Sequence, residues 1–328
     1  MDIAILGAGA WGSALATALS ARHDVLLWTR SAAQRTRIAA TRTSEYLPDV
    51  ALPPAVAVTD DMAEAARGRE LVIAATPTAG LREALGSLAA HAGPMPLLWA
   101  CKGFELGTAR LPHEIVAEAL PAWREVGALS GPSFAIEVAR GLPAALTVAS
   151  LDAGFARRAA AALHQAPLRI YSSGDVIGVE LGGALKNIMA IAAGISDGLG
   201  LGANARAALI TRGLAEMARL GVRMGGEPDT FMGLTGLGDL VLTATGDLSR
   251  NRTVGMRIAS GMPVQRVLAE LGHVAEGVSS ARAARDLALR HGVDMPITEA
   301  VCAVLFEGLA PMTAVESLLS RETRPEHA

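Results

Sequence analysis

The sequence predicts an α/β fold in which a mostly parallel sheet wrapped by helices is followed by an all-α domain. Up to about residue 170, short apolar segments alternate with alanine- and leucine-rich stretches of helical spacing, which is typical of a parallel sheet. Beyond Asp175 the apolar stretches keep helical spacing, and none has the pattern of a strand. We therefore expect two domains, residues 1–174 and residues 175–328.

Eight short apolar segments are the predicted strands, because each is rich in Val, Ile, Leu or Ala and is bounded by turn residues. The stretches between them have the Ala and Leu content of helices. A polar turn at residues 172–175, with an acceptable helix cap, opens the second domain. The predicted strands are residues 3–6, 25–28, 56–58, 71–75, 97–101, 126–129, 145–149 and 168–170; the predicted helices are 12–22, 61–66, 81–90, 111–120, 155–165, 176–194, 207–220, 254–260, 263–271, 279–291 and 297–307.

The composition excludes several classes of protein. With 328 residues, 51% hydrophobic and 19% charged, the chain is neither disordered nor collagen-like. Its 29 basic and 32 acidic residues give a net charge of −3, without the basic excess that nucleic-acid binding normally requires. The two cysteines, Cys101 and Cys302, cannot form a disulfide framework and indicate a reducing compartment. We expect a cytoplasmic protein with no nucleic-acid partner and no metal site.

The longest uncharged run, residues 3–21, has to be tested as a membrane segment or signal peptide, because its 19 residues reach the necessary length. Asp2 stands where a signal peptide has basic residues, and Gly7, Gly9 and Gly12 interrupt the run. A second apolar stretch, between Lys186 and Asp197, has only ten residues. We therefore expect no membrane span.

Lysine usage gives the first indication of a site. Of the 29 basic residues, 27 are arginine and only Lys102 and Lys186 are lysine. Lysine, unlike arginine, can lose its proton when its pKa is lowered. The two positions are therefore candidates for acid/base chemistry, the alternative being that they survive by chance.

The first predicted strand leads into Gly7-Ala8-Gly9-Ala10-Trp11-Gly12 and then a helix, which is the context that a dinucleotide-binding glycine motif requires. Gly7 permits the tight turn, Gly9 lets backbone N–H groups approach a pyrophosphate, and Gly12 lets the helix lie close to the strand. The sheet domain is therefore predicted to be Rossmann-like, although a turn without a ligand would use the same glycines.

Cofactor choice is predicted from the end of the second strand. Folds that prefer NAD usually carry an acid there that binds the ribose 2′-hydroxyl, whereas this chain has Thr29-Arg30. An arginine can pair with a 2′-phosphate, so NADPH should be accepted and could be preferred. Alternatively, Arg30 stacks on the adenine.

Further polar residues follow strands at the edge of the sheet where open α/β sheets bind ligands. Lys102 follows the fifth predicted strand, and residues 130–135, Ser-Gly-Pro-Ser-Phe-Ala, follow the sixth. These small residues indicate a loop that a substrate can approach closely, or else a plain turn. Lys186-Asn187 lies inside an apolar helix, where the lysine either snorkels outward or lines a cleft that lowers its pKa.

The helical domain contains two dense glycine stretches, residues 197–204 and 233–240, which indicate special backbone geometry. The second stretch delivers Asp239. Soon afterwards, Ser249-Arg250-Asn251-Arg252 forms a loop of donors suited to a phosphate, unless the arginines are merely solvated.

Taken in order, these motifs, together with residues 207–214, Ala-Ala-Leu-Ile-Thr-Arg-Gly-Leu, and 248–252, Leu-Ser-Arg-Asn-Arg, closely resemble the bacterial type of NAD(P)-dependent glycerol-3-phosphate dehydrogenase. The resemblance covers about residues 3–299. Thr235 and the segment 43–46 depart from the family pattern. The resemblance implies interconversion of dihydroxyacetone phosphate and sn-glycerol 3-phosphate with NADPH or NADH, in the supply of glycerophospholipid precursors.

The resemblance also implies roles for individual residues. Lys186 would be the catalytic acid/base, with Asp239 or a water restoring its proton. The substrate would be lined by Lys102, Gly131, Ser133, Lys186, Asp239, Ser249, Arg250 and Asn251. The cofactor would be bound by Gly7, Gly9, Ala10, Trp11, Gly12, Arg30, Lys102, Ala135, Arg250, Val274 and Glu276.

Two rival functions would use some of the same motifs. Another two-domain hydroxyacid dehydrogenase would bind a carboxylate and has less need of Arg250 and Asn251. A non-catalytic NAD(P) sensor would keep the glycine motif but has no reason to retain Lys186 and Asp239. A homodimer through the helical domain is our hypothesis for the assembly.

Overall fold

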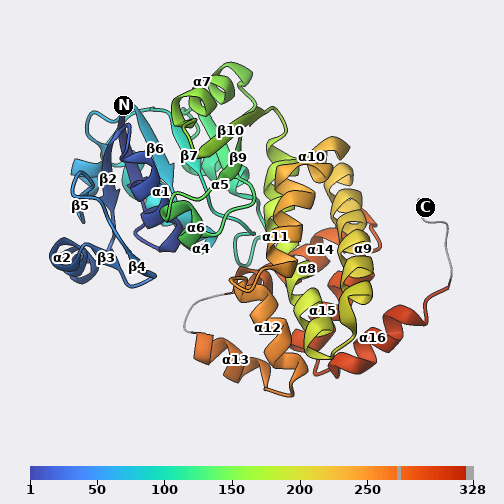
Figure 1. The fold of residues 1–328 in the computed structure, drawn as a ribbon. Helices are drawn as coiled ribbons and strands as arrows, with labels where there is room; N and C mark the ends of the chain where they lie inside the picture. Colours follow the sequence, from blue (N-terminus) through green and yellow to red (C-terminus); the bar gives the residue numbers. More distant parts are fainter. Residues whose placement is uncertain (272–274, 323–328) are drawn as a thin grey trace.

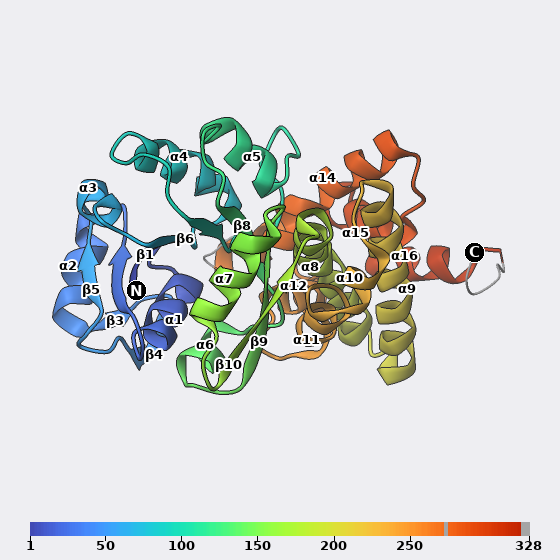
Figure 2. The same ribbon diagram turned by 90° about the horizontal axis from the view of Figure 1, so that it is seen from above.

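The computed structural model describes residues 1–271 and 275–322 of the chain. A sheet flanked by helices forms one half of the molecule, and a group of helices forms the other (Figure 1). Seen from above, the two halves lie side by side, with α8 (Val176–Gly198) next to the sheet (Figure 2). The predicted order, a mostly parallel sheet domain followed by helices, is confirmed.

The eight-stranded sheet contains all eight predicted strands, and each begins within one residue and ends within three residues of its predicted position. Its strand order is β10-β9-β8-β7-β6-β1-β2-β5. Every pairing is parallel except that of β8 with β9, which is antiparallel. The strands are β1 (Asp2–Leu6), β2 (Asp24–Trp28), β5 (Ala57–Thr59), β6 (Leu71–Ala74), β7 (Leu97–Trp99), β8 (Val126–Ser130), β9 (Ala144–Ala149) and β10 (Leu168–Ser173).

The register of the central strands determines where the functional loops meet. Leu6 at the end of β1 pairs with Trp28 of β2 on one side and with Ala74 of β6 on the other. Ala74 in turn pairs with Trp99 at the end of β7. Since the four strands are parallel, the segments that follow them leave the sheet at one edge.

The sheet domain also has elements that the sequence analysis leaves as loops. A Ser31 side chain caps α2 by accepting from the backbone N–H of Gln34, but the helix buries only Ile38, so it lacks an apolar stripe. The two-stranded hairpin β3–β4 and the five-residue α6 are too short for periodicity to show. The helices of this domain and the hairpin are α1 (Ala10–Leu19), α2 (Ala32–Thr41), β3 (Thr43–Ser44), β4 (Leu47–Ala51), α3 (Met62–Ala66), α4 (Thr78–Ala89), α5 (Pro112–Ala119), α6 (Ala135–Ala139) and α7 (Ala153–Leu163).

In the described part of the second half, residues 175–271 and 275–322, the six predicted helices are present together with four further helical segments. Three of the additional elements, α10, the π-helical turn η1 and α11, surround the second glycine stretch, where glycine obscures the helical pattern. The elements after α8 are α9 (Gly202–Arg223), α10 (Pro228–Met232), η1 (Leu234–Gly238), α11 (Asp239–Thr245), α12 (Arg250–Ala259), α13 (Val264–Leu271), α14 (Glu276–His291), α15 (Pro296–Phe306) and α16 (Pro311–Leu319).

Helix α8 is the centre of the helical domain. The Asp175 side chain caps its first turn, and Leu185, Ile188 and Met189 in its middle are fully buried. Among the described residues, α8 is also the one helix long and apolar enough to cross a membrane. This finding corrects the expectation from the ten uncharged residues between Lys186 and Asp197, because the helix begins ten residues before Lys186. Since 94% of its most apolar window is buried inside the protein, α8 has the surroundings of a core helix.

Candidate active site

The only two lysines in the sequence bind the same carboxylate. Lys186, from the middle of α8, donates to Oδ1 of Asp239 over 2.5 Å. Lys102, which follows β7, donates to Oδ2 over 2.7 Å. Asp239 is the first residue of α11, and its side chain is 1% exposed. The sheet edge and the helical domain therefore meet in one buried charge cluster.

Lys186 lies inside the protein and does not snorkel outward. Its side chain is 8% exposed. Burial lowers its pKa to about 8, although the charge of Asp239 acts in the opposite direction. This amine can therefore change its protonation state near neutral pH, as a general acid/base must.

Thr243 belongs to the same cluster, although the sequence analysis gives it no role. Its hydroxyl accepts a hydrogen bond from Lys186 over 2.9 Å and donates to the backbone oxygen of Asp239 over 2.6 Å. Thr243 follows Asp239 by four residues, so the two side chains lie on one face of α11. This spacing is the sequence signal for the contact between them.

Two glycines before Lys186 explain how the cluster packs. A Cβ atom on Gly182 would lie 2.3 Å from the backbone oxygen of Thr235, so α8 touches the π-helical turn that leads to Asp239. A Cβ atom on Gly183 would lie 3.3 Å from Cγ of Lys102. The lysine that follows β7 therefore runs closely past α8.

The loop after β8 supplies backbone acceptors to the cluster. Lys102 donates to the backbone oxygen of Gly131 over 3.0 Å, and the Ser133 hydroxyl donates to the same oxygen over 3.1 Å. Gly131 has a φ of +140°, a conformation that favours glycine. The predicted substrate residues Lys102, Gly131 and Ser133 are therefore neighbours.

The predicted phosphate cluster begins a helix, whereas the sequence analysis expects a loop. Ser249 is the N-cap of α12, and its side chain accepts from the backbone N–H of Arg252 over 3.2 Å. Arg250 is exposed at the first helical position. The prediction of a loop is wrong because residues 249–252 are all polar and show no apolar helical pattern. Serine is a preferred N-cap residue, so Ser249 is the sequence signal for this helix start. A helix N-terminus still suits an anion.

Asn251 is buried and bound within the protein. Its amide donates to Oδ1 of Asn187 over 3.0 Å, and its own oxygen accepts from the backbone N–H of Gly277 over 3.0 Å. Asn187 lies next to Lys186 on α8 and also approaches Glu276 at 3.4 Å. Burial raises the pKa of Glu276, while the charges of Arg250 and the two lysines lower it. Asn187 thus joins the start of α12 to the middle of α8, next to Lys186.

The glycine motif fits a dinucleotide. Gly7 has a φ of +116°, and a Cβ atom on Gly12 would lie 1.9 Å from the backbone oxygen of Gly7, so α1 begins directly against β1. A Cβ atom on Gly9 would meet nothing within 4 Å, and no side chain caps α1 there. Its N-terminal N–H groups are therefore available to a pyrophosphate. Ala10 is the first residue of α1, and Trp11 packs in one apolar cluster with Ala135.

Two other residues of the cofactor prediction, Arg30 and Val274, have different outcomes. The Arg30 side chain is 75% exposed and forms a 3.3 Å ion pair with Glu83 of α4. Val274 lies outside the described residues. The hydroxyl of Thr76, in the segment after β6, is buried and has no hydrogen-bond partner, which leaves a polar group for a ligand at this edge. In residues 1–271 and 275–322, no group of three His, Cys, Asp or Glu is placed to hold a metal.

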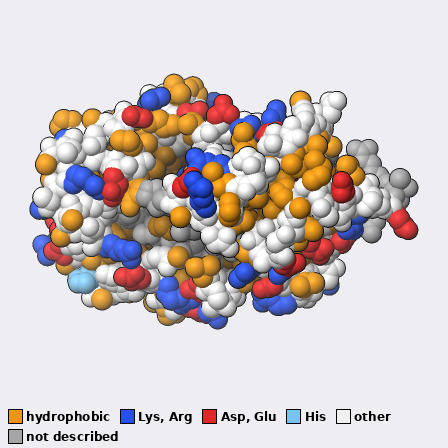
Figure 3. Space-filling view, turned by 90° about the horizontal axis from the view of Figure 1, so that it is seen from below, with side chains coloured by type: hydrophobic (Ala, Val, Ile, Leu, Met, Phe, Trp, Pro, Cys, Tyr) orange, Lys and Arg blue, Asp and Glu red, His pale blue; other side chains and the backbone are white. Residues whose placement is uncertain are grey.

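A hollow lies between the two halves of the molecule. Seen from below, basic side chains gather near the middle of the face, beside this hollow (Figure 3). The arrangement can therefore receive an anionic ligand between the sheet edge and the start of α12.

Comparisons with known proteins agree with this geometry. Models of the N-terminal and C-terminal parts of NAD-dependent glycerol-3-phosphate dehydrogenase match residues 2–156 and 175–316. The chain is 58% identical to glycerol-3-phosphate dehydrogenase [NAD(P)+] of Aromatoleum aromaticum, over 99% of this chain and 100% of that protein, and 58% identical to that of Thiobacillus denitrificans over the same shares. It is similar to the crystal structure of glycerol-3-phosphate dehydrogenase from Coxiella burnetii, with a TM-score of 0.93, 40% identity, and coverage of 98% of this chain and 99% of that one. The chain therefore belongs to the NAD-dependent glycerol-3-phosphate dehydrogenase family.

Proposed function

We propose that this NAD(P)-dependent oxidoreductase interconverts dihydroxyacetone phosphate and sn-glycerol 3-phosphate, with Lys186 as its general acid/base. The observation that carries the proposal is the joint binding of Lys186 and Lys102 to Asp239, beside the start of α12. An ammonium group can protonate a developing alkoxide, and a helix N-terminus with an arginine can hold a phosphate.

The proton chemistry follows from the position of Lys186. When bound, the nicotinamide supplies the hydride that C2 of the ketone accepts. The C2 oxygen then gains negative charge, which the Lys186 ammonium stabilises and neutralises by giving up its proton. Asp239 and Thr243 hold the amine in place, and Asp239 or a water returns the proton. In the oxidation direction the neutral amine removes the proton from the alcohol.

We assign substrate binding to both sides of this charge cluster. Lys102, Gly131 and Ser133 come from the sheet domain and lie around one backbone oxygen. Ser249 and Arg250 come from the start of α12, where the guanidinium and the free N–H groups suit a phosphate. Since the Asn251 side chain is bound to Asn187, we assign it the positioning of this helix end as well as a phosphate contact.

Cofactor binding is assigned to the glycine motif and to residues around the same edge of the sheet. The open space at Gly9 and the uncapped start of α1 support a pyrophosphate site. Glu276 is close enough to both lysines for their charges to lower its pKa, which supports a contact near the reacting end of the cofactor. The proposed cofactor residues are Gly7, Gly9, Ala10, Trp11, Gly12, Arg30, Lys102, Ala135, Arg250, Val274 and Glu276.

One assay separates this function from the two rivals. Oxidation of NADPH is measured with dihydroxyacetone phosphate and, in parallel, with a 2-keto acid. We expect turnover with the phosphate ester and almost none with the keto acid. A preference for the keto acid would support a hydroxyacid dehydrogenase, and no oxidation with either compound would support a sensor.

We propose a boundary at residues 174/175, supported by the end of β10 at Ser173 and the Asp175 cap of α8, and a cytoplasmic role in glycerophospholipid supply. For a homodimer we propose the groove of about 1250 Å³ between α9, α15 and α16. Figure 3 shows hydrophobic side chains gathered over this end of the molecule.

The character of this groove favours a second copy of the chain. Its floor is apolar, and its rim carries both Arg223 and Glu322, so two equivalent surfaces can be complementary. Leu319 is 81% exposed there. Leu319→Asp should leave the fold intact and shift the sedimentation of the protein from dimer to monomer, whereas a monomeric wild type would contradict the proposal.

A further inference from the structure

We propose that Asp197 is a positioning residue that fixes the phosphate-binding end of α12 relative to Lys186. The inference rests on the proposed function, because it takes Ser249 and Arg250 as the phosphate site. Asp197 lies near the end of α8, eleven residues after the lysine, and its side chain binds Arg206 and Arg252, which are not among the proposed substrate residues. It acts through Arg252, the third helical residue of α12.

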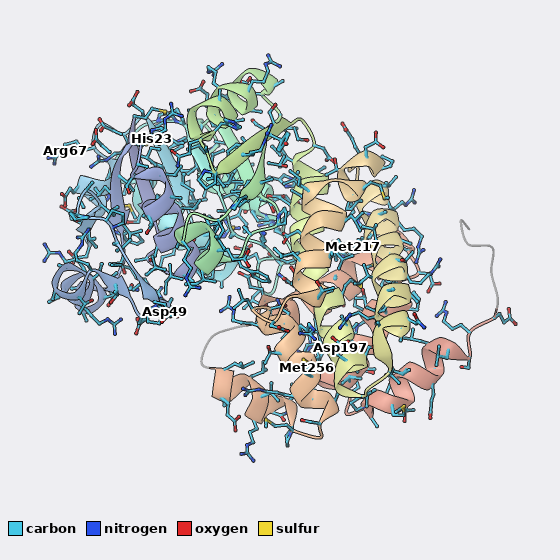
Figure 4. All side chains as sticks on the ribbon, viewed as in Figure 1. His23, Asp49, Arg67, Asp197, Met217 and Met256 are labelled. Carbon is cyan, nitrogen blue, oxygen red and sulfur yellow. The ribbon has the colours of Figure 1, made fainter. Side chains whose placement is uncertain are left out.

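Helices α8 and α12 run in the same direction and lie against each other along most of α12. Asn251 binds Asn187 at one end, and a Cβ atom on Gly194 would lie 2.0 Å from the backbone oxygen of Arg252. Further along, a Cβ atom on Gly198 would lie 2.8 Å from the backbone oxygen of Met256. Figure 4 shows Asp197 and Met256 where the two helices run side by side. The position of α12 along the axis of α8 therefore determines the distance between the proposed phosphate site and Lys186.

Asp197 binds two arginines from two different helices. Its Oδ2 accepts from Nε of Arg252 over 2.8 Å, and its two oxygens accept from Nη1 of Arg206 on α9 over 3.0 and 3.1 Å. The side chains of Asp197 and Arg252 are only 10% and 12% exposed, so solvent screens their attraction weakly. The second acidic partner of Arg252, Asp247, is 97% exposed and therefore holds it less firmly.

The first glycine stretch gains a role from this contact. Gly200 and Gly202 have φ values of +71° and +86°, so the chain turns sharply after α8 and enters α9. The turn brings Arg206 back to Asp197. Arg206 and Arg252, which follow Asp197 by 9 and 55 positions, thus bind one carboxylate, and only Arg252 belongs to the helix that begins at the proposed phosphate site.

Loss of the Asp197 charge should loosen the start of α12 without touching the reacting groups. The phosphate of the substrate would then be held in a less fixed position relative to Lys186. A displacement of about 1 Å at a positioned group can cost as much as ~10²-fold in rate. A substrate without a phosphate does not use this end of α12 and should not sense the change.

The test uses Asp197→Asn, which keeps the shape of the side chain. We expect the KM for dihydroxyacetone phosphate and the Ki of inorganic phosphate, as a competitive inhibitor, each to rise ~10-fold. The kcat/KM for unphosphorylated dihydroxyacetone should stay within about twofold, and the KM for NADPH, which shares only Arg250 with this helix end, should rise much less than the KM for dihydroxyacetone phosphate. A purely structural role would instead change all four constants together.

Arg206→Ala is the matched control, because it removes the other arginine of the same carboxylate and leaves Arg252 bound. It should keep all four constants near their wild-type values. If Asp197→Asn does not fold, Arg252→Lys provides the test, because a compact ammonium lacks the planar fork that binds Asp197 through Nε and Asp247 through Nη1. The KM of the double variant Asp197→Asn/Arg252→Lys for dihydroxyacetone phosphate should not exceed that of the more strongly affected single variant.

Two results would overturn the inference: an unchanged KM for dihydroxyacetone phosphate in Asp197→Asn, or equal losses with the phosphorylated and the unphosphorylated substrate. Arg250→Ala tests the underlying phosphate site separately. If Arg250→Ala leaves the KM for dihydroxyacetone phosphate unchanged, the proposed phosphate site is wrong. If it raises that KM while Asp197→Asn does not, only the role of Asp197 is wrong.

Discussion

Nζ of Lys186 lies 2.5 Å from Oδ1 of Asp239, and the other oxygen of that carboxylate is bound by Lys102. The single negative charge of the buried Asp239 carboxylate therefore interacts with the ammonium groups of both lysines. The charge of Asp239 raises the pKa of Lys186, while burial and the charge of Lys102 lower it. The balance of these effects determines the pH range in which Lys186 can act.

Asp239→Asn should therefore shift the pH dependence of the reaction. Without the carboxylate, the two ammonium groups face each other and the pKa of Lys186 falls below its value of about 8. The alkaline decline of kcat in the reduction direction should then begin at a lower pH. Asp247→Asn, at a site that is 97% exposed, is the control and should leave the profile in place. An unchanged profile in Asp239→Asn would contradict the coupling.

The wild-type enzyme should show opposite pH dependences in the two directions. Reduction needs the protonated amine, so its kcat should fall as the pH rises through about 8. Oxidation needs the neutral amine, so its kcat should rise over the same range. Initial rates at saturating substrate between pH 6 and 10, roughly two units to either side of this pKa, would measure both limbs. If kcat changes with pH in the same way in both directions, another group or step controls the rate.

Arg250→Ala should discriminate between a phosphate site and a cofactor site. We expect a strong rise in the KM for dihydroxyacetone phosphate and a lower kcat, because phosphate binding also aligns the reacting carbon. Unphosphorylated dihydroxyacetone should be a very poor substrate of the wild type and be little affected by the change. Equal factors for both substrates would instead assign Arg250 to the cofactor or to the fold.

Arg30→Asp should change the preference between the two cofactors. Arg30 lies beyond the end of β2, is 75% exposed, and pairs with Glu83 only weakly through solvent. A 2′-phosphate can therefore displace that pair, whereas an aspartate would repel it. We expect kcat/KM to fall more for NADPH than for NADH, with Glu83→Gln as the charge control. An equal loss for both cofactors would place Arg30 against the adenine.

Much of the fold could be predicted from the sequence because its buried elements have clear apolar patterns. All eight strands of the main sheet and helix α8 are examples. Helix α2 was missed because only Ile38 is buried on it. The π-helical turn before Asp239 was missed because Gly236 and Gly238 hide its helical pattern.

The site was predictable to a similar extent. The rarity of lysine singled out Lys102 and Lys186, and the structure brings both to Asp239. The sequence analysis assigned no role to Asn187 or Asp197, because their importance comes from contacts with residues 64 and 55 positions later in the chain. Such pairings depend on how α8 packs against α12, which no local pattern reports.

The measurement that tests the central claim most directly is single-turnover reduction by Lys186→Ala, with NADPH binding measured on the same protein. In the proposed mechanism Lys186 meets the reacting oxygen and not the dinucleotide phosphates, so turnover should fall by ~10² to 10⁴ or more while the Kd for NADPH stays near its wild-type value. Retention of more than about a tenth of the wild-type rate would contradict the assignment of Lys186 as the general acid.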